Sequence, residues 1–324
     1  MVTALSPSSL QADPVDWPAV LKKADEPGLR RIDGLDDWYF LPSDLRHLAT
    51  AFKEDAAPVV PTSDGRDPSS IILQFHEALK KKGIHLIVVP VPEKPRIRAD
   101  RLVAGVKPGD AAATAPLAKA SGRFIQPLKA AGVTVFDPSE LFMTWLGEGK
   151  DPVYCQTDSH YTARTCERLA ASLVKASPEL AGTKTEAAFK IEASEITFEG
   201  DHSNGGAKET LSLNTVKVPA GDAFPAADDE SPVLLMGDSH CLVFSTGKDM
   251  HAEGAGLFDH LAAQLGRAPS LIAVRGSGAN AARVALYRKG KRSSDFLTSK
   301  KVVIWCFSAR EFTQNEGWKK IPLP

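Results

Sequence analysis

Short apolar runs separated by helix-forming segments constrain the fold of this chain most. Three of these runs, residues 84–89, 233–236 and 301–307, contain almost no charged side chain. A short, continuous apolar run bounded by turn residues is typical of a strand that is covered on both faces. Amphipathic helical patterns occupy the sequence between them, as at residues 69–82 and 257–265. This alternation predicts a three-layer α/β/α domain with a mostly parallel central sheet.

A sharp turn follows the apolar run at residues 233–236, with the sequence Gly237-Asp238-Ser239. Glycine permits such a turn because it has no Cβ atom, and the turn would raise the serine hydroxyl at the carboxyl end of a strand. Open α/β sheets bind ligands at that edge, and the backbone N–H groups after the turn can face an oxyanion. The alternative is an ordinary strand-to-helix turn in which Ser239 caps the helix.

A nucleophilic serine needs a base that a carboxylate orients, because the hydroxyl is weakly nucleophilic by itself. Of the eight histidines, His160 is the best candidate, since Asp158 precedes it by two residues. A carboxylate at this spacing can accept from the imidazole N–H and hold the useful tautomer. The alternatives are a turn residue for Asp158 and a polar residue near a helix start for His160. Together with Ser239, these residues supply the three parts of a serine triad.

Two blocks in a fixed order carry a family resemblance: Thr157-Asp-Ser-His-Tyr-Thr162 comes first and Met236-Gly-Asp-Ser-His240 comes later. This pair resembles the SGNH-hydrolase-like domain of alginate O-acetyltransferases of the AlgJ/AlgX type, in which the blocks stand in the reverse order of ordinary SGNH esterases. Further similar blocks extend the resemblance over roughly residues 30–313. Three positions, Ser159, Tyr161 and His240, differ from the usual Thr, Trp and Phe of the family. These differences leave the triad intact and bear on acceptor specificity.

The resemblance implies a polysaccharide O-acetyltransferase that acts on an alginate-like exopolysaccharide through an acetyl-serine intermediate. It also implies a polysaccharide acceptor, an acetyl donor supplied by a membrane-bound O-acyltransferase, and a periplasmic or other extracytoplasmic location. We expect no cofactor and no metal. Two alternatives remain: a carbohydrate acetylesterase with the same triad, and a non-catalytic polysaccharide-binding protein.

Several residues near the predicted carboxyl ends of strands are candidates for an auxiliary role. Arg275 and Asn280 follow a predicted strand at residues 271–274 and could donate to an oxyanion. Arg275 is preferred, because its family counterpart follows the serine by a similar interval. Gly237 would let a substrate approach the backbone closely. Lys94 follows the strand at residues 84–89 and could meet an anionic sugar, with an exposed loop lysine as the alternative.

Composition and charge exclude several other classes of protein. The formal net charge is −1, so we expect no basic face for nucleic acid. No apolar run approaches the ~20 residues that span a bilayer, and residues 1–13 do not resemble a signal peptide. The four cysteines lack the Cys-x-x-Cys spacing of zinc sites, which leaves reduced core residues or a Cys155–Cys241 disulfide. Asp201 and His202 have no third ligand at a useful spacing, so we do not expect a metal there.

The predicted organisation is an N-terminal arm at residues 1–30, extended or partly helical, and one SGNH-hydrolase-like domain at residues 31–324. An irregular insertion around residues 178–231 is expected to lie over the sheet and to form part of the acceptor groove.

Overall fold

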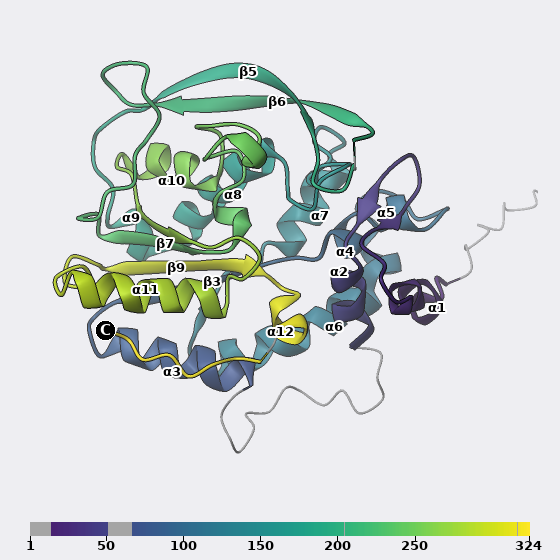
Figure 1. Cartoon of the computed structure of the whole chain (residues 1–324), viewed down its shortest axis with the longest axis horizontal. Coiled ribbons are helices and arrows are strands. Elements are labelled where there is room, and N and C mark those ends of the chain that lie inside the picture. The colour runs from purple at the N-terminus through teal and green to yellow at the C-terminus, as the bar shows by residue number, and fades with distance from the viewer. Residues whose placement is uncertain (1–13, 51–66, 204, 316) are drawn as a thin grey trace, which may run out of the picture.

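A five-stranded parallel sheet forms the centre of the molecule (Figure 1). The computed structural model describes residues 14–50, 67–203, 205–315 and 317–324. The strand order is β4-β3-β9-β7-β8, and all four neighbouring pairs are parallel. The strands are β3 (His85–Val91), β4 (Thr134–Val135), β7 (Val233–Gly237), β8 (Ser270–Ala273) and β9 (Val302–Ser308).

Side chains of the central strands alternate between two separate apolar clusters, one on each face of the sheet. In β3, for example, Ile87 and Val89 belong to one cluster, while Leu86 and Val88 belong to the other. Because both faces are covered, these strands are apolar almost throughout their length, as expected for parallel sheets. The structure confirms the predicted three-layer α/β/α architecture.

Helices cover both faces of this sheet (Figure 1). On the first face lie α1 (Trp17–Leu21), α2 (Pro42–Thr50), α7 (Ser139–Gly147), α8 (Ala163–Ala176) and α10 (Leu257–Leu265). On the second lie α3 (Pro68–Lys80), α11 (Asn280–Arg292) and α12 (Glu311–Gln314), while α6 (Ala111–Ala130) contributes to both. Short elements complete the chain: η1 (Lys22–Asp25), β1 (Ile32–Asp33), β2 (Tyr39–Phe40), α4 (Lys94–Ile97), α5 (Ala99–Leu102), α9 (Pro178–Ala181), η2 (Ser239–Cys241) and η3 (Lys248–Met250).

Helix boundaries follow local sequence signals. The side chain of Thr162 accepts a hydrogen bond from the backbone N–H of Thr165 and thereby caps α8. Helix α10 ends at Gly266, whose φ of +70° is readily adopted by glycine. Of the N-terminal arm, residues 1–13 lie outside the described part of the chain. From residue 14 onward the chain packs into the core through Trp17 and Leu21.

The segment predicted as irregular contains a regular antiparallel hairpin, so this prediction is wrong for residues 190–217. Strands β5 (Lys190–Glu199) and β6 (Lys208–Lys217) pair along their full length. The hairpin lies over α8 and α10 (Figure 1), with Phe198 and Leu213 among its few buried apolar side chains. Because one face of the hairpin is solvated and its inner face is partly polar, the alternation that marks a strand is weak in the sequence.

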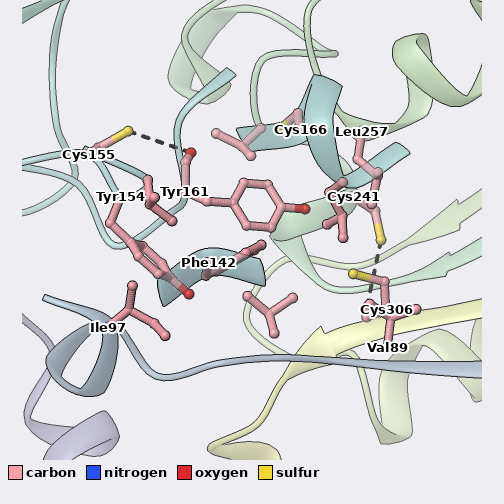
Figure 2. Packing of buried hydrophobic residues seen from close by; sticks show 14 of the residues in the cluster. Val89, Ile97, Phe142, Tyr154, Cys155, Tyr161, Cys166, Cys241, Leu257 and Cys306 are labelled. Carbon is pink, nitrogen blue, oxygen red and sulfur yellow. Dashed lines mark hydrogen bonds between the residues drawn. The ribbon is translucent and has the colours of Figure 1, made fainter. Parts of the chain in front are cut away.

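All four cysteines are buried free thiols, so the Cys155–Cys241 disulfide is not formed. Figure 2 shows them around the aromatic side chains of Phe142 and Tyr161. The Cys155 thiol donates to the Tyr161 carbonyl at 3.6 Å. These cysteines therefore serve as small core residues. Within the described ranges, no helix combines the length and the apolar character needed to cross a membrane.

Candidate active site

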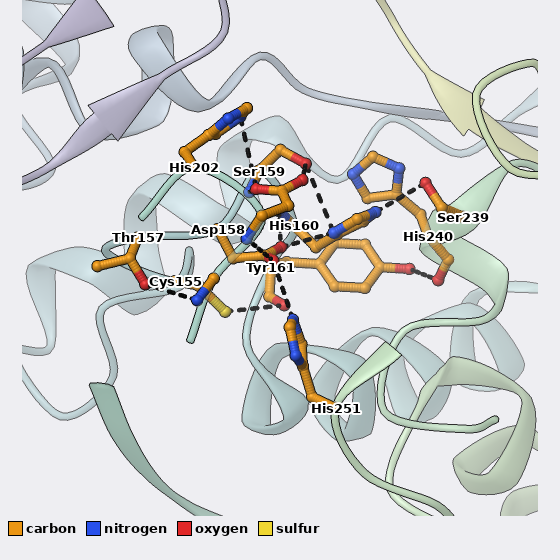
Figure 3. A network of polar contacts seen from close by, with 12 residues as sticks. Cys155, Thr157, Asp158, Ser159, His160, Tyr161, His202, Ser239, His240 and His251 are labelled. Atoms are coloured by element: carbon orange, nitrogen blue, oxygen red, sulfur yellow. Dashed lines mark hydrogen bonds and ion pairs between the residues drawn. The ribbon is translucent and has the colours of Figure 1, made fainter. Parts of the chain in front are cut away.

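Ser239, His160 and Asp158 form one chain of hydrogen bonds (Figure 3). The Nε2 atom of His160 lies 2.7 Å from Oγ of Ser239, and its Nδ1 atom lies 2.6 Å from Oδ1 of Asp158. Ser239 follows β7, whereas the other two residues precede α8 and are about 80 positions earlier in the chain. The structure thus brings together the three residues predicted as a triad, at hydrogen-bond distance for proton transfer.

Charges around the imidazole favour its role as a base. Burial alone would lower the pKa of His160, but the charge and hydrogen bond of Asp158 outweigh this effect and raise that pKa. Burial also opposes ionisation of Asp158. The attraction and hydrogen bond of His160, and then those of His251, outweigh it and hold the Asp158 pKa well below its usual value. The ionised carboxylate accepts from Nδ1–H, which leaves Nε2 free to accept the serine proton.

Lys94 lies beneath the loop that carries Asp158. It was predicted either to meet an anionic sugar or to be exposed on a loop, and both predictions are wrong. Its side chain is buried, and Nζ donates to three backbone carbonyls, those of Tyr39 at 2.6 Å, Asp158 at 2.9 Å and Gln156 at 3.1 Å. Burial lowers the pKa of this amine to about 8. Because the Tyr39 carbonyl belongs to β2 and the other two belong to the triad loop, Lys94 ties β2 to that loop. All three donors of its ammonium group are engaged, so none is directed at a sugar.

The hairpin also holds the triad loop. The carboxylate of Glu209 on β6 accepts from the backbone N–H groups of Gln156 and Thr157 at 2.8 and 3.0 Å. The carboxylate of Asp201, just after β5, accepts from the backbone N–H and the hydroxyl of Ser159 at 2.8 and 2.5 Å. These bonds orient the backbone on both sides of Asp158.

The serine loop repeats the local geometry of the histidine loop. In Asp238-Ser-His240, Oδ1 of Asp238 accepts from both the backbone N–H and Nδ1 of His240 at 2.9 Å, as Oδ1 of Asp158 does from His160. The Oδ2 atom of Asp238 accepts from the backbone N–H of Ser308 on β9 at 2.7 Å. The rings of His240 and His160 meet edge to face at 4.9 Å. Asp238 therefore anchors the nucleophile loop to the central strand.

Two of the predicted auxiliary residues, Arg275 and Asn280, have other contacts. The Arg275 guanidinium pairs with Asp249, with Nη2 2.7 Å from its carboxylate, and is about half exposed. The Asn280 amide donates to the Asn315 side chain and to the Gly317 carbonyl. Among the described residues, neither side chain hydrogen-bonds a triad member, so their roles as oxyanion donors stay predictions.

A packing requirement explains Gly237. A Cβ atom at this position would lie 1.6 Å from the Cys306 carbonyl oxygen on β9, so only glycine fits. The backbone N–H of Ser239, two positions after Gly237, donates to no acceptor in the described part of the chain. That N–H is therefore available to an oxyanion.

A functional contact that was not predicted joins His251 to the triad: its Nε2 atom lies 2.9 Å from Oδ2 of Asp158. No motif surrounds His251, which follows a short 3₁₀ turn and is 93 positions from Asp158 in the sequence. A search for a histidine beside a carboxylate in sequence could not find this contact.

Asp158, His160 and Asp201 place one oxygen or nitrogen atom each within 4.8 Å of one another. These side chains are already engaged in hydrogen bonds, with Asp158 bound to His160 and Asp201 bound to Ser159. We therefore assign the cluster to the hydrogen-bond network of the triad.

Comparison with known proteins places this geometry in a family. The family described as SGNH hydrolase-like domain, acetyltransferase AlgX, matches residues 32–309. The O-acetyltransferase domain of Pseudomonas putida AlgJ has a similar structure, with a TM-score of 0.62 and 20% identity over 88% of this chain and 92% of that one. Pseudomonas aeruginosa AlgX gives a TM-score of 0.58 and 19% identity, over 89% of this chain and 68% of the other.

A third similar structure is Bacillus cereus PatB1 with a sulfonyl adduct, with a TM-score of 0.51 and 12% identity over 88% of this chain and 96% of that one. Comparison with curated protein sequences gives no significant match. The family match covers most of the chain and includes both loops of the hydrogen-bonded Ser-His-Asp arrangement. The chain therefore belongs to the AlgX family of SGNH hydrolase-like acetyltransferases.

Proposed function

We propose that this protein transfers acetyl groups to hydroxyls of an alginate-like polysaccharide through an acetyl-Ser239 intermediate. The observation that carries this proposal is the contact of 2.7 Å between Nε2 of His160 and Oγ of Ser239, with Asp158 on the other side of the imidazole. Membership of an acetyltransferase family supports the reaction class.

In the first half-reaction, Oγ of Ser239 attacks the acetyl carbonyl carbon and its proton moves to Nε2 of His160. The developing oxyanion receives a hydrogen bond from the backbone N–H of Ser239. The donor's leaving oxygen then departs and takes the proton from His160, which leaves acetyl-Ser239 and a neutral imidazole. Arg275 would have to leave Asp249 to serve as a second oxyanion donor.

In the second half-reaction, a sugar hydroxyl replaces the leaving group. His160 removes its proton as the hydroxyl oxygen attacks the acetyl-serine, and the proton returns to Oγ of Ser239 when the ester bond breaks. Because only neutral His160 can act as this base, activity rises as pH increases through the raised pKa of His160.

The acceptor groove that we propose lies under the hairpin. A groove of about 780 Å³ runs between β5 and β6 on one side and the segment around Asp151, Thr162 and Arg164 on the other. Its lining includes no triad residue, and it adjoins the triad loop through Thr162, two positions after His160. Its lining mixes hydroxyl, amide and charged groups, which suit a polysaccharide. We further propose that a membrane-bound O-acyltransferase supplies the acetyl group and that the reaction takes place outside the cytoplasm, as the resemblance to AlgJ and AlgX implies.

Replacing the nucleophile and the base tests the mechanism. An activated acetyl ester is supplied with an oligosaccharide acceptor, and mass spectrometry follows acetylation of the protein and of the acceptor. Ser239→Ala and His160→Ala should each lower acceptor acetylation by about 10²-fold or more. Ser294→Ala, at an exposed position, is the matched control and should behave as the wild type. Activity of both site variants within about tenfold of the wild type contradicts the mechanism.

The same assay separates transfer from hydrolysis. Acetylated acceptor with little free acetate supports the transferase. Net acetate release without acceptor labelling would show an esterase that uses the same residues, and the absence of an acetyl-Ser239 adduct would point to a binding protein.

A further inference from the structure

The Asp158 carboxylate accepts hydrogen bonds on both of its oxygens. Oδ1 accepts from Nδ1 and from the backbone N–H of His160 at 2.6 and 2.9 Å. Oδ2 accepts from the backbone N–H of Asp201 and from Nε2 of His251, each at 2.9 Å. The carboxylate is 1% exposed, so these donors replace water almost completely. Asp158 is thus shared between two imidazoles, only one of which reaches Ser239.

An unusual loop and the hairpin hold His251 in this position (Figure 3). Three residues of the loop other than glycine, Phe244, Lys248 and His251, have positive φ angles of 58°, 55° and 72°. Such angles are uncommon and persist only where the surrounding structure enforces them. The His251 ring packs against Phe198 of β5, with ring centroids 4.1 Å apart, and against Phe244 at 5.5 Å. The strained backbone and the packed ring together direct Nε2 toward Asp158.

We propose that His251 is a positioning residue that fixes the Asp158 carboxylate through Oδ2, so that Oδ1 stays aligned with the imidazole of His160. Because the His251 ring packs on Phe198 of β5, the hairpin supports the triad through this aromatic contact. It also supports the triad loop through the carboxylates of Asp201 and Glu209. His251 acts on the reaction through Asp158 and does not contact Ser239 in the described structure.

Loss of the hydrogen bond from His251 should change the pKa of His160 in one direction only. The Asp158 charge would be less compensated, so it would stabilise the His160 imidazolium more strongly and raise the His160 pKa further. The other charged and titratable groups that interact with Asp158 or His160 are Lys94, Cys155, Asp201, His202, Asp238 and His240. All of them remain in a His251 variant, so a change in the His160 pKa reports the loss of His251 itself.

Two substitutions separate the hydrogen bond from the packing. His251→Phe keeps an aromatic ring against Phe198 but removes the N–H donor. His251→Gln keeps an N–H donor near the position of Nε2 but removes the ring. Both place a residue other than glycine at the same positive φ, so the backbone strain is matched. His76→Phe, on α3 and outside the site, is the control for losing one histidine.

The main measurement is the His160 pKa, from NMR titration of histidine-labelled protein with the signal assigned through His160→Asn. We expect His251→Phe to raise that pKa by about 0.5 to 1, while His251→Gln stays within about 0.3 of the wild type. A fluorophosphonate that labels Ser239 gives the second readout. Its rate at pH 6.5 should fall about three- to tenfold in His251→Phe and stay within about twofold in His251→Gln.

The result that would overturn the proposal is a wild-type His160 pKa in His251→Phe. Equal changes in both variants would overturn it as well, because they would assign His251 to packing alone. The inference rests on the proposed function only in giving the triad a catalytic role. Absence of Ser239 labelling in the wild type would refute the catalytic role, whereas the NMR titration tests the contact between His251 and Asp158 independently.

Discussion

Replacing Lys94 by methionine gives the sharpest test of how the site is built. The substitution keeps the length of the side chain and removes the donors to the Tyr39, Gln156 and Asp158 carbonyls. The Gln156 carbonyl retains the backbone N–H of Tyr39 as a donor at 3.1 Å, so two carbonyls lose the partner that Lys94 supplies. Each carbonyl that loses its donor costs roughly 1–1.5 kcal/mol, so we expect the free energy of unfolding at pH 7 to be about 2–3 kcal/mol lower in the variant.

The contribution of Lys94 to the free energy of unfolding also depends on pH, because burial changes the pKa of its amine. Burial lowers the Lys94 pKa from 10.5 to about 8, so the folded state binds this proton less strongly than the unfolded state. Burial therefore imposes a cost on the charged amine below pH 8, which offsets part of what its hydrogen bonds contribute, and this cost disappears as pH rises from about 8 to 10.5. The whole change amounts to about 3 kcal/mol. The stability of the wild type relative to Lys94→Met should thus increase by about that amount between pH 7 and 10.5.

The assay is urea denaturation followed by tryptophan fluorescence at several pH values, together with fluorophosphonate labelling of Ser239. Lys300→Met is the matched control, because Lys300 is also buried and donates to the Asp229 and Ser231 carbonyls. The control should lose stability but keep the labelling rate, whereas Lys94→Met should lose both. A stability difference between wild type and Lys94→Met that does not change with pH would refute the reasoning.

Three further predictions concern Asp259, Gly237 and Glu209. Burial raises the Asp259 pKa to about 7, so its contribution to stability is complete below pH ~4 and is lost as pH rises through 7. Asp259→Asn should therefore be more stable than the wild type by about 4 kcal/mol at pH 8 and similar to it at pH 4, as measured by denaturation at both pH values. Gly237→Ala places a methyl group against the Cys306 carbonyl, and circular dichroism should show a loss of folded protein or a destabilisation above about 4 kcal/mol. In Glu209→Gln only one side-chain oxygen remains, so the side chain can accept only one set of the loop N–H bonds. The substitution should slow Ser239 labelling about tenfold and lower stability by about 2 kcal/mol. Unchanged labelling would contradict the role of the hairpin.

The sheet and the three triad residues were predictable because their signals are local. Apolar runs such as residues 233–236 mark buried strands, and Asp158 and His160 stand two positions apart, close enough for a turn to join them. The sequence around Asp158 and His160 does not show how close they lie to Ser239. The rule that ligands bind at the carboxyl ends of parallel strands places Ser239 at that edge of the sheet. The loop of Asp158 and His160 lies between α7 and α8 and follows no strand of the central sheet directly, so its contact with Ser239 is evident only in the structure.

The residues that support the triad could not be predicted in the same way. Lys94 can be buried because three carbonyls from two segments distant in the sequence surround its ammonium group, and a sequence does not show that convergence. His251 reaches Asp158 from a loop 93 positions away, without a motif around it. Helix α6 also continues past Pro127, although proline usually interrupts a helix. The buried side chains of Phe124 and Leu128 offset the one hydrogen bond that a proline removes.

The order of strands in the central sheet has a consequence for biosynthesis. Strand β9 pairs with β3 on one side and with β7 on the other, although it is translated after both of them. Until residues 302–308 leave the ribosome, the nascent chain has two apolar strand edges with no partner between them, and Asp238 lacks the Ser308 amide that anchors its loop. Ser239 can therefore reach the position seen in this structure only after residues 302–308 have been synthesised.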